Sequence, residues 1–383
     1  MSSGGWKTTT LGVIAEIVMG QSPSGDTCNA IGDGTPLLNG PTEFGSNNPC
    51  PIQFTTDPKK ISEEGDLLFC VRGSTTGRMN WADQKYAIGR GLAVLRHRSG
   101  YSFQPFLKGI IDSYLSLLLA EATGSTFPNV SSQQLNNLTI EVPDLRTQRR
   151  IAAILSALDE KIELNRQINA ALEAIAQEIF KEWFVDFRFP GSTGEMQCVG
   201  VGSEPAPTGP IPKNWQVGRL GDLVNISSGK GLKKDQFKDN GFPVLGANGR
   251  IGFSDDFLFD EELILTGRVG TLGTFQLVSG KVWISDNVLI LKPIKNENYH
   301  YAYFLLKTIN FENLNRGSTQ PLVTKTDLVN QTSLIPSNEL LDRFNLICRS
   351  LFSGVSISNQ QIATLVNIRE NLLPKLMSGE IEV

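Results

Sequence analysis

The strongest constraint in this sequence is an internal duplication. Landmarks of the first half recur in the same order in the second half. Three return after 209 residues: Trp6, Leu11-Gly12 and Gly20 are matched by Trp215, Leu220-Gly221 and Gly229. Two return after 193 residues: Gly124-Ser125-Thr126 is matched by Gly317-Ser318-Thr319, and Val142-Pro143 by Ile335-Pro336. The two shifts differ because the first half carries extra loop residues. The duplication predicts two copies of one module.

Each half closes with a heptad pattern typical of a long coiled-coil helix. Steps of four and three residues in the first half give Ile151, Leu155, Leu158, Ile162, Asn165, Asn169, Leu172, Ala176, Ile179 and Trp183. The same steps 193 residues later give Phe344, Cys348, Leu351, Val355, Ser358, Ile362, Leu365, Arg369, Leu372 and Leu376. Eight of the ten positions in each set are apolar. Two long helices with apolar seams are therefore predicted.

Asn165 and Ser358 interrupt the two seams at the same step. A buried polar residue there would fix the register of the helices at some cost in stability. An alternative alignment, one residue further on, pairs residues 165–168 with 359–362 and keeps the seam. Pro374 lies in the last heptad of the second helix and is expected to kink or fray its end.

The pattern divides the chain into five segments. Residues 1–145 form a first head, 146–189 a first long helix, 190–212 a linker rich in Pro and Gly, 213–337 a second head, and 338–383 a second long helix. Short apolar runs at 67–71, 92–95, 263–265 and 288–291 predict strands, and helical spacing predicts helices at 106–121 and 299–307. The fold class expected is α+β, with two mixed α/β heads.

Composition limits the class of protein. A chain of 383 residues is long enough for two or three domains. It has no apolar run that could span a membrane, and its first residues lack the regions of a signal peptide, so a cytoplasmic location is expected. Its five cysteines are scattered without a C-x-x-C, and only two histidines exist. We therefore expect reduced thiols and no zinc site.

The charge is unevenly distributed. The net charge of −4 alone argues against nucleic acid. Between residues 67 and 108, however, one acid stands against seven bases: Arg72, Arg78, Lys85, Arg90, Arg96, Arg98 and Lys108. From residue 141 to 186, nine acids stand against six bases. A basic stripe beside an acidic helix fits a DNA reader that also binds protein, although a solvated charged surface explains the same counts.

Motifs of catalysis are missing from the sequence. The glycine-rich residues 246–252 do not join a strand to a helix as in a dinucleotide fold, and indicate a turn instead. Asn48-Pro49-Cys50-Pro51 only partly matches an amino-methylation motif. Pro143-Asp144 with Asp159-Glu160-Lys161 matches a nuclease string formally, but its second part lies on a predicted helix. We interpret it as a chance match and predict no catalytic residue and no metal site.

The remaining motifs are suited to binding a ligand and not to catalysis. In each head a strand runs into a turn rich in Gly, Ser or Thr, and Arg, at residues 71–78 and 266–273. Glycines permit close backbone approach, hydroxyls can hold phosphates, and arginine can read guanine. The predicted DNA-binding residues are Arg72, Ser74, Thr75, Thr76, Arg78, Lys85 and Arg90 in the first head, and Lys230, Lys233, Lys234, Arg250, Arg268, Arg316 and Lys325 in the second. Plain polar surface turns are the alternative.

Further motifs carry a family resemblance. They are Gly65-Asp66-Leu67-Leu68, Gly124-Ser125-Thr126 with a proline-bearing strand leading to Gln148 and Ile151, and residues 178–187, 211–215 and 372–381. With them the chain resembles, over essentially its whole length, the specificity (S) subunits of type I restriction-modification systems, the HsdS family. Two features depart from that pattern. The second head has Asp260-Glu261-Glu262 in place of Gly-Asp, and its helix lacks a glutamine near Leu341.

The resemblance implies two target recognition domains, each reading one half of a split, asymmetric double-stranded DNA site. It also implies that the long helices pack antiparallel, set the half-site spacing and dock two modification (methyltransferase) subunits. The spacer and docking candidates are Ile151, Leu155, Leu158, Ile162, Leu172, Ile179, Trp183, Phe344, Leu351, Val355, Ile362, Leu365, Leu372 and Leu376. A seam over residues 151–183 would be about 50 Å long at 1.5 Å per residue.

The resemblance further implies that S-adenosylmethionine and the methylating residues belong to the modification subunits. ATP and Mg²⁺ are expected with restriction subunits that translocate and cut DNA, and no cofactor is expected on this chain. Other classes remain open: an enzyme acting alone, a structural coiled-coil scaffold, or a two-headed DNA-binding adaptor without a methyltransferase partner.

Overall fold

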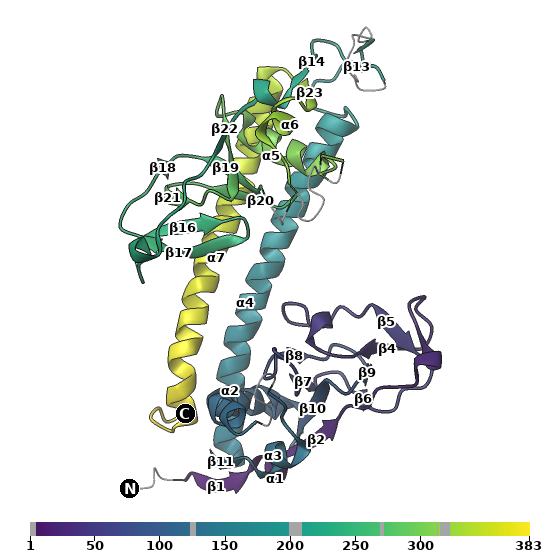
Figure 1. Cartoon of the computed structure of the whole chain (residues 1–383), viewed down its shortest axis with the longest axis vertical. Coiled ribbons are helices and arrows are strands. Elements are labelled where there is room, and N and C mark those ends of the chain that lie inside the picture. Colours follow the sequence, from purple (N-terminus) through teal and green to yellow (C-terminus); the bar gives the residue numbers. More distant parts are fainter. Residues whose placement is uncertain (1–4, 123–127, 199–208, 269–271, 312, 315–321) are drawn as a thin grey trace. The chain divides into compact units, whose positions relative to one another are not determined.

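The computed structural model describes residues 5–122, 128–198, 209–268, 272–311, 313–314 and 322–383 (Figure 1). The chain divides into two compact units. Unit 1 combines residues 1–166 with 360–383, and unit 2 comprises residues 167–359. The division cuts both long helices, α4 (Leu145–Phe180) and α7 (Asn338–Met377). Each unit therefore contains one head and a part of each helix.

In its described residues, the first head consists of short strands and three α-helices, with 3-10 turns between them. Its elements are β1 (Lys7–Thr10), α1 (Leu11–Ile14), β2 (Ala15–Met19), β3 (Cys28–Asn29), β4 (Thr35–Leu38), β5 (Gln53–Thr55), β6 (Ile61–Ser62), β7 (Leu67–Cys70), β8 (Met79–Trp81), β9 (Tyr86–Ile88), β10 (Leu92–His97), α2 (Gln104–Ala120), α3 (Ser132–Asn137) and β11 (Thr139–Val142). The main sheet is antiparallel, in the order β2-β10-β7-β8. A second sheet, β3-β5-β4-β9-β6, contains one parallel pair, β4 and β9. Strands β1 and β11 pair separately.

The second head repeats this plan. Its elements are β14 (Gln216–Arg219), β15 (Val224–Ser228), β16 (Phe242–Gly246), β17 (Gly249–Ser254), β18 (Phe259–Asp260), β19 (Leu263–Gly267), β20 (Phe275–Val278), β21 (Lys281–Ile284), β22 (Val288–Pro293), α5 (Asn298–Thr308), α6 (Lys325–Val329) and β23 (Thr332–Ile335). The main sheet is β15-β22-β19-β20, and the second is β17-β16-β21-β18 with β16 and β21 parallel. Strands β14 and β23 pair as β1 and β11 do. The duplication and the predicted α+β class are confirmed.

The predicted strands and helices of the heads are confirmed within a few residues, and the structure adds detail to two local expectations. The described parts of residues 190–212 are not linker alone, because β12 (Met196–Gln197) pairs antiparallel with β13 (Ile211–Pro212). Helix α7 does not fray at Pro374 but continues to Met377. A proline removes one N–H and crowds the carbonyl four residues earlier, but the neighbouring turns can carry the helix on when its last residues are buried. Leu376 is fully buried there.

The two long helices run antiparallel within each unit. In unit 1, Asn165 donates from Nδ2 to Oε1 of Gln361 at 3.2 Å, and Arg369 forms an ion pair with Asp159, with 2.7 Å between Nε and Oδ1. In unit 2, Asn169 donates to Asn359 at 2.8 Å, and a Cβ on Gly354 would lie 3.1 Å from Cδ1 of Leu172. Residue numbers thus rise along α4 as they fall along α7. Asn165 is 1% exposed, so the predicted polar interruption is buried and its amide is bonded across the pair.

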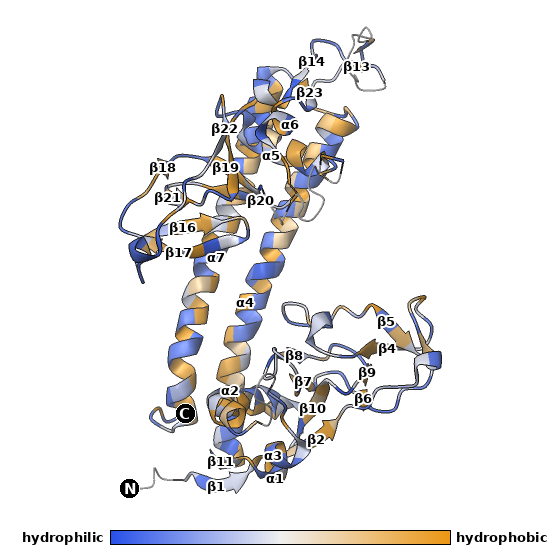
Figure 2. Cartoon of the chain, in the orientation of Figure 1, coloured by the Kyte–Doolittle hydropathy of each residue, from blue (hydrophilic) through white to orange (hydrophobic). Residues whose placement is uncertain are grey.

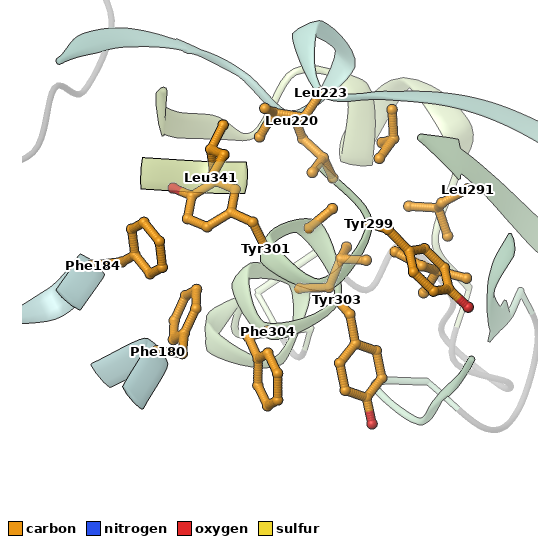
Figure 3. Packing of buried hydrophobic residues seen from close by; sticks show 14 of the residues in the cluster. Phe180, Phe184, Leu220, Leu223, Leu291, Tyr299, Tyr301, Tyr303, Phe304 and Leu341 are labelled. Atoms are coloured by element: carbon orange, nitrogen blue, oxygen red, sulfur yellow. The ribbon is translucent and has the colours of Figure 1, made fainter. Parts of the chain in front are cut away.

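Each head shares one apolar core with the helices. In unit 1, residues of the main sheet and α2 pack with Ile151 and Leu155 of α4 and Leu376 of α7. In unit 2, α5 supplies aromatic side chains that face Phe180 of α4 and Phe184 of the π-helical turn Lys181–Val185 (Figure 3). The hydropathy of both long helices alternates along their length, as an apolar seam requires (Figure 2).

Both histidines connect a head to a long helix. His97 Nε2 lies 3.2 Å from Oε1 of Gln148 in α4, and His300 Nδ1 lies 2.5 Å from Oδ1 of Asn345 in α7. Burial lowers the pKa of both imidazoles, which keeps them neutral at pH 7. Asn345 thereby supplies the amide that the sequence lacks at Leu341, one helical turn further along.

The landmark glycines Gly20 and Gly229 permit a close approach of two chain segments. A Cβ on Gly20 would lie 2.1 Å from the carbonyl oxygen of Gly89, and one on Gly229 would lie 2.2 Å from that of Ser285. Both distances are far shorter than a van der Waals contact, and backbone atoms cannot move aside as the end of a side chain can. The repeated glycine is therefore a packing requirement of both heads.

We expect Gly20→Ala to destabilise the first head by at least about 2 kcal/mol, because the added methyl forces β2 and the turn after β9 apart. The urea midpoint of the purified chain measures this loss. Gly25→Ala is the matched control, since its methyl would meet no described atom within 4 Å. Equal midpoints for the two variants would contradict the packing role.

Candidate nucleic-acid interface

One hollow of about 400 Å³ on the first head brings two of the predicted arginines together. Arg72, two residues after β7, and Arg90, between β9 and β10, are both exposed. The other lining residues are Ser22, Asn39, Gly40, Pro41 and Gly91. Arg72 also donates from Nε to Oδ1 of Asn129 at 3.5 Å, a weak bond that leaves its outer nitrogens directed elsewhere. Two guanidinium groups beside a hydroxyl and an amide suit an anionic or base-edge ligand.

The glycine-rich turn after β7 divides into exposed and structural residues. Ser74 and Thr75 are exposed, as a contact with DNA requires. Thr76 instead holds the turn, with Oγ1 2.8 Å from the carbonyl oxygens of both Gly73 and Pro128. Arg78 donates to the carbonyls of Pro41 and Phe44 at 3.1 and 3.0 Å. The Arg78 guanidinium therefore binds the backbone of residues 41–44 and fixes that loop.

The basic stretch is not a continuous positive stripe, because most of its cations bind protein groups. Arg96 donates from Nε and Nη2 to the fully buried carboxylate of Asp66, both at 2.7 Å. That carboxylate raises the pKa of Arg96. The other engaged members are Arg98 with the Gly12 carbonyl, Lys85 with Glu63 and Lys108 with Asp112. Arg72 and Arg90, which line the hollow, remain the best placed for an external ligand.

Asp66, the acid directly before β7 of the main sheet, has a counterpart in the second head. Glu262 accepts from both terminal nitrogens of Arg349 in α7, at 2.9 and 2.6 Å. The second head lacks the Gly-Asp pair but still places a carboxylate before the strand. The partner of this carboxylate is Arg349 of the long helix α7, whereas the partner of Asp66 is Arg96 of the neighbouring strand β10.

The predicted cations of the second head lie on several different elements and loops. Lys230, Lys233 and Lys234 follow β15 and are exposed, and Lys325 begins α6 and is exposed. Arg250 stacks on Phe253, with Cζ 4.7 Å from the ring centroid. Arg268 is exposed at the end of β19, where its N–H donates to the Asn287 carbonyl at 3.0 Å. Arg316 lies outside the described residues, as do Gly124-Ser125-Thr126 and Gly317-Ser318-Thr319.

The predicted seam residues face inward. Every one of them is buried or half-buried: Ile151, Leu155, Leu158, Ile162, Leu172, Ile179, Trp183, Phe344, Leu351, Val355, Ile362, Leu365, Leu372 and Leu376. They therefore hold the helices and heads together. In the described part of the chain, no group of three or more His, Cys, Asp and Glu side chains could hold a metal ion, and no helix is long and apolar enough to cross a membrane.

A second, exposed apolar flank of the helices was missed by the sequence reasoning. In unit 1, Leu164 and Ile368 are 48% and 44% exposed. In unit 2, Ile357 and Ile175 are 55% and 48% exposed. Ile357 and Ile368 follow Leu164 and Ile175 by the same 193 residues that relate the seams. Among the exposed aliphatic side chains of the helices, which also include Leu145, Ile168 and Leu346, each unit thus contains one pair that the internal repeat relates to the pair of the other unit. That repeat was the signal available in the sequence.

Comparison with known proteins places these features in a family. The profile of the type I restriction modification DNA specificity domain matches residues 3–174 and again residues 212–340. The chain belongs to this specificity family. The two matches contain the two heads, so the duplication found in the sequence is a duplication of the family's own domain.

Named relatives of the specificity family agree with this assignment. The specificity subunit of the type I restriction enzyme MjaIX from Methanocaldococcus jannaschii is 29% identical over 72% of this chain and 70% of its own length. That of HindI from Haemophilus influenzae is 24% identical over 84% and 88%. The crystal structure of a type I S subunit from M. genitalium has the same fold, with a TM-score of 0.63 over 98% of this chain and 97% of that chain at 19% identity.

Proposed function

We propose that this chain is the DNA sequence-recognition subunit of a type I restriction-modification complex in the cytoplasm, and that each head reads one half of a bipartite, asymmetric site. The observation that carries the proposal is the repetition of one head with different exposed side chains. The first head offers Arg72 and Arg90 at a hollow, while the second offers Lys230 and Arg268 on loops of the same sheets. A repeated frame with changed side chains suits two half-sites of different sequence.

The chain supplies recognition, and the chemistry belongs to its partners. The acids of the formal nuclease string have structural roles here. Asp144 accepts from the N–H of Thr147 at the start of α4, and Asp159 pairs with Arg369. S-Adenosylmethionine would be bound by the modification subunits, and ATP and Mg²⁺ would serve restriction subunits.

The exposed flank of the helices supports docking of two modification subunits. Leu164 with Ile368 in unit 1, and Ile357 with Ile175 in unit 2, are equivalent pairs. Exposed apolar surface marks protein-binding sites where it gathers into a patch, and the repeat places such side chains at equivalent positions of both units. One pair in each unit offers two equivalent places, which fits two copies of one partner.

Two alternatives compete with this function: a structural coiled-coil scaffold, and a two-headed DNA-binding adaptor without a methyltransferase partner. A scaffold explains the seam, but it gives no role to two exposed arginines at one hollow. Gel shift with random-sequence DNA, with and without a co-expressed modification subunit, separates the three.

The central test substitutes one arginine in each head of the chain assembled with modification subunits. Arg72→Ala should weaken or relax recognition of one half-site, and Arg268→Ala should affect the other. A bidentate base contact is worth about 1–3 kcal/mol, so the loss of discrimination is measurable by sequencing the methylated sites.

Two outcomes would contradict the proposal. A change of base preference in both half-sites after Arg72→Ala would exclude two independent heads. Methyl transfer to DNA by the homogeneous chain alone, supplied with S-adenosylmethionine, would exclude a purely recognising subunit. Lys7→Ala serves as the control for loss of one positive charge, since Lys7 is exposed on β1, outside both larger sheets.

A further inference from the structure

Equivalent backbone hydrogen bonds fix one turn in each head. The turn of residues 89–91 joins β9 to β10, and that of residues 285–287 joins β21 to β22 (Figure 1). The Gly89 N–H donates to Leu38 O at 2.8 Å, as Ser285 does to Leu245 at 2.9 Å. Closure of the turn is also repeated, by Leu92 N–H to Gly89 O at 3.1 Å and by Val288 N–H to Ser285 O at 3.2 Å.

The surrounding segments contact the two turns in matching ways. Gln21 N–H donates to Ile88 O, and Lys230 N–H donates to Ile284 O, both at 2.8 Å. On the other side, Val71 N–H donates to Gly91 O at 2.9 Å, and Arg268 N–H donates to Asn287 O at 3.0 Å. Four pairs of equivalent bonds therefore align the turns residue by residue. The middle residue is Arg90 in the first head and Asp286 in the second.

Both middle residues are exposed beside the same neighbouring segment. The Arg90 N–H donates to Oγ of Ser22 at 3.3 Å, and Gly231, 209 residues after Ser22, lies against the Asp286 carboxylate. A Cβ on Gly231 would be 3.4 Å from Oδ2 of Asp286. Asp286 Oδ1 also accepts from the Ser285 hydroxyl at 3.1 Å. One backbone frame thus carries a cation in one head and an anion in the other.

The opposite charges decide what this position can contact. A phosphate contact is independent of sequence, so two heads that place it at the same point of one frame would need the same sign of charge. A carboxylate repels phosphate but accepts hydrogen bonds from the exocyclic amine of cytosine, whereas arginine donates two bonds to guanine O6 and N7. Base reading is the contact that both side chains can make.

We propose that Arg90 and Asp286 occupy the equivalent specificity-determining position of the two heads, with Arg90 reading a guanine in one half-site and Asp286 a cytosine in the other. This inference rests on the proposed function and adds to it the identity of one base in each half. The fixed backbone of the turn presents the side chain, and the side chain alone selects the base.

The test is selection of double-stranded DNA with randomised base pairs by the full chain assembled with modification subunits, followed by sequencing of the bound pool. The wild type should enrich a two-part motif. Arg90→Ala should remove the preference for guanine at one position of one half, and Asp286→Ala the preference for cytosine at one position of the other. The loss expected at each position lies between about 5-fold and about 150-fold.

A conservative variant and two controls sharpen the test. Asp286→Asn should change the selected cytosine to adenine, because an amide pairs with adenine N6 and N7. Lys7→Ala and Asp255→Ala remove the same charges elsewhere. Asp255 follows β17 at the end of β16 opposite to the turn and pairs with Lys238. Both controls should leave the motif unchanged.

Three results would overturn the inference. A uniform loss of affinity in Arg90→Ala, with the motif intact and a lower salt dependence, would identify a phosphate contact instead. An unchanged motif in both alanine variants would remove any role in recognition. A wild type that enriches no two-part motif would refute the proposed function itself, whereas the first two results would leave that function standing.

Discussion

Replacing Phe344 with alanine is expected to reduce the free energy of unfolding of unit 2 by about 3–5 kcal/mol. Phe344 of α7 is fully buried, and its ring packs against the rings of Phe184, Trp183 and Phe304 at centroid distances of 5.0, 6.0 and 6.0 Å. Trp183 and Phe184 lie in the π-helical turn that follows α4, and Phe304 lies in α5 of the second head. The substitution therefore removes the contact that joins both helices to the head, and it leaves a cavity where close packing had been.

Urea unfolding measures the loss, and hydrogen exchange locates it. Amides of α5 should exchange faster in Phe344→Ala, while those of α2 should keep their rate because the first head has its own core. Leu346→Ala is the matched control, since this leucine lies two residues further along the same helix and is 72% exposed. It should change stability by less than about 0.5 kcal/mol. Equal losses in the two variants would contradict the role assigned to the aromatic core.

The sequence predicted the elements whose residues repeat with a clear period. The seams of α4 and α7 extend over more than four heptads, and the strands β7, β10, β19 and β22 are runs of large apolar residues. Such patterns can be recognised in a single sequence, because burial of one face restricts the positions on that face to apolar residues. The second sheet of each head was not predicted, because strands such as Cys28–Asn29 and Ile61–Ser62 are two residues long and carry no period.

The candidate interface was only partly predictable for a different reason. A count of charges cannot reveal which cations are already bound, and Arg96 meets Asp66 across thirty residues of chain. Asp286 is not among the predicted contact residues, because these are basic or hydroxyl-bearing side chains. Its significance depends on hydrogen bonds between segments far apart in the sequence, which align it with Arg90. The repeated glycines Gly20 and Gly229 were visible from the start, but their role required the position of the turns that they contact.

Lengthening both helices by one heptad is expected to lengthen the spacer between the half-sites by roughly 3 base pairs. Seven residues add about 10 Å of helix at 1.5 Å per residue, and B-DNA rises 3.4 Å per base pair. Duplicating residues 162–168 of α4 and residues 355–361 of α7 keeps the seam in phase, because Ile162 and Val355 are equivalent and both are buried. The spacer of the methylated motif, read by sequencing, measures the result.

An insertion out of phase with the heptads should have a far larger effect. Two extra residues after Arg166 would rotate the rest of α4 by about 200°, which moves Leu172 and Ala176 from the seam to the opposite face. Ala176 is fully buried, and its neighbours in the core belong to both helices and the second head. We expect this variant to lose assembly and methylation altogether, whereas the matched heptads keep both. Retained methylation with an unchanged spacer in the lengthened variant would mean that the helices do not set the distance between half-sites.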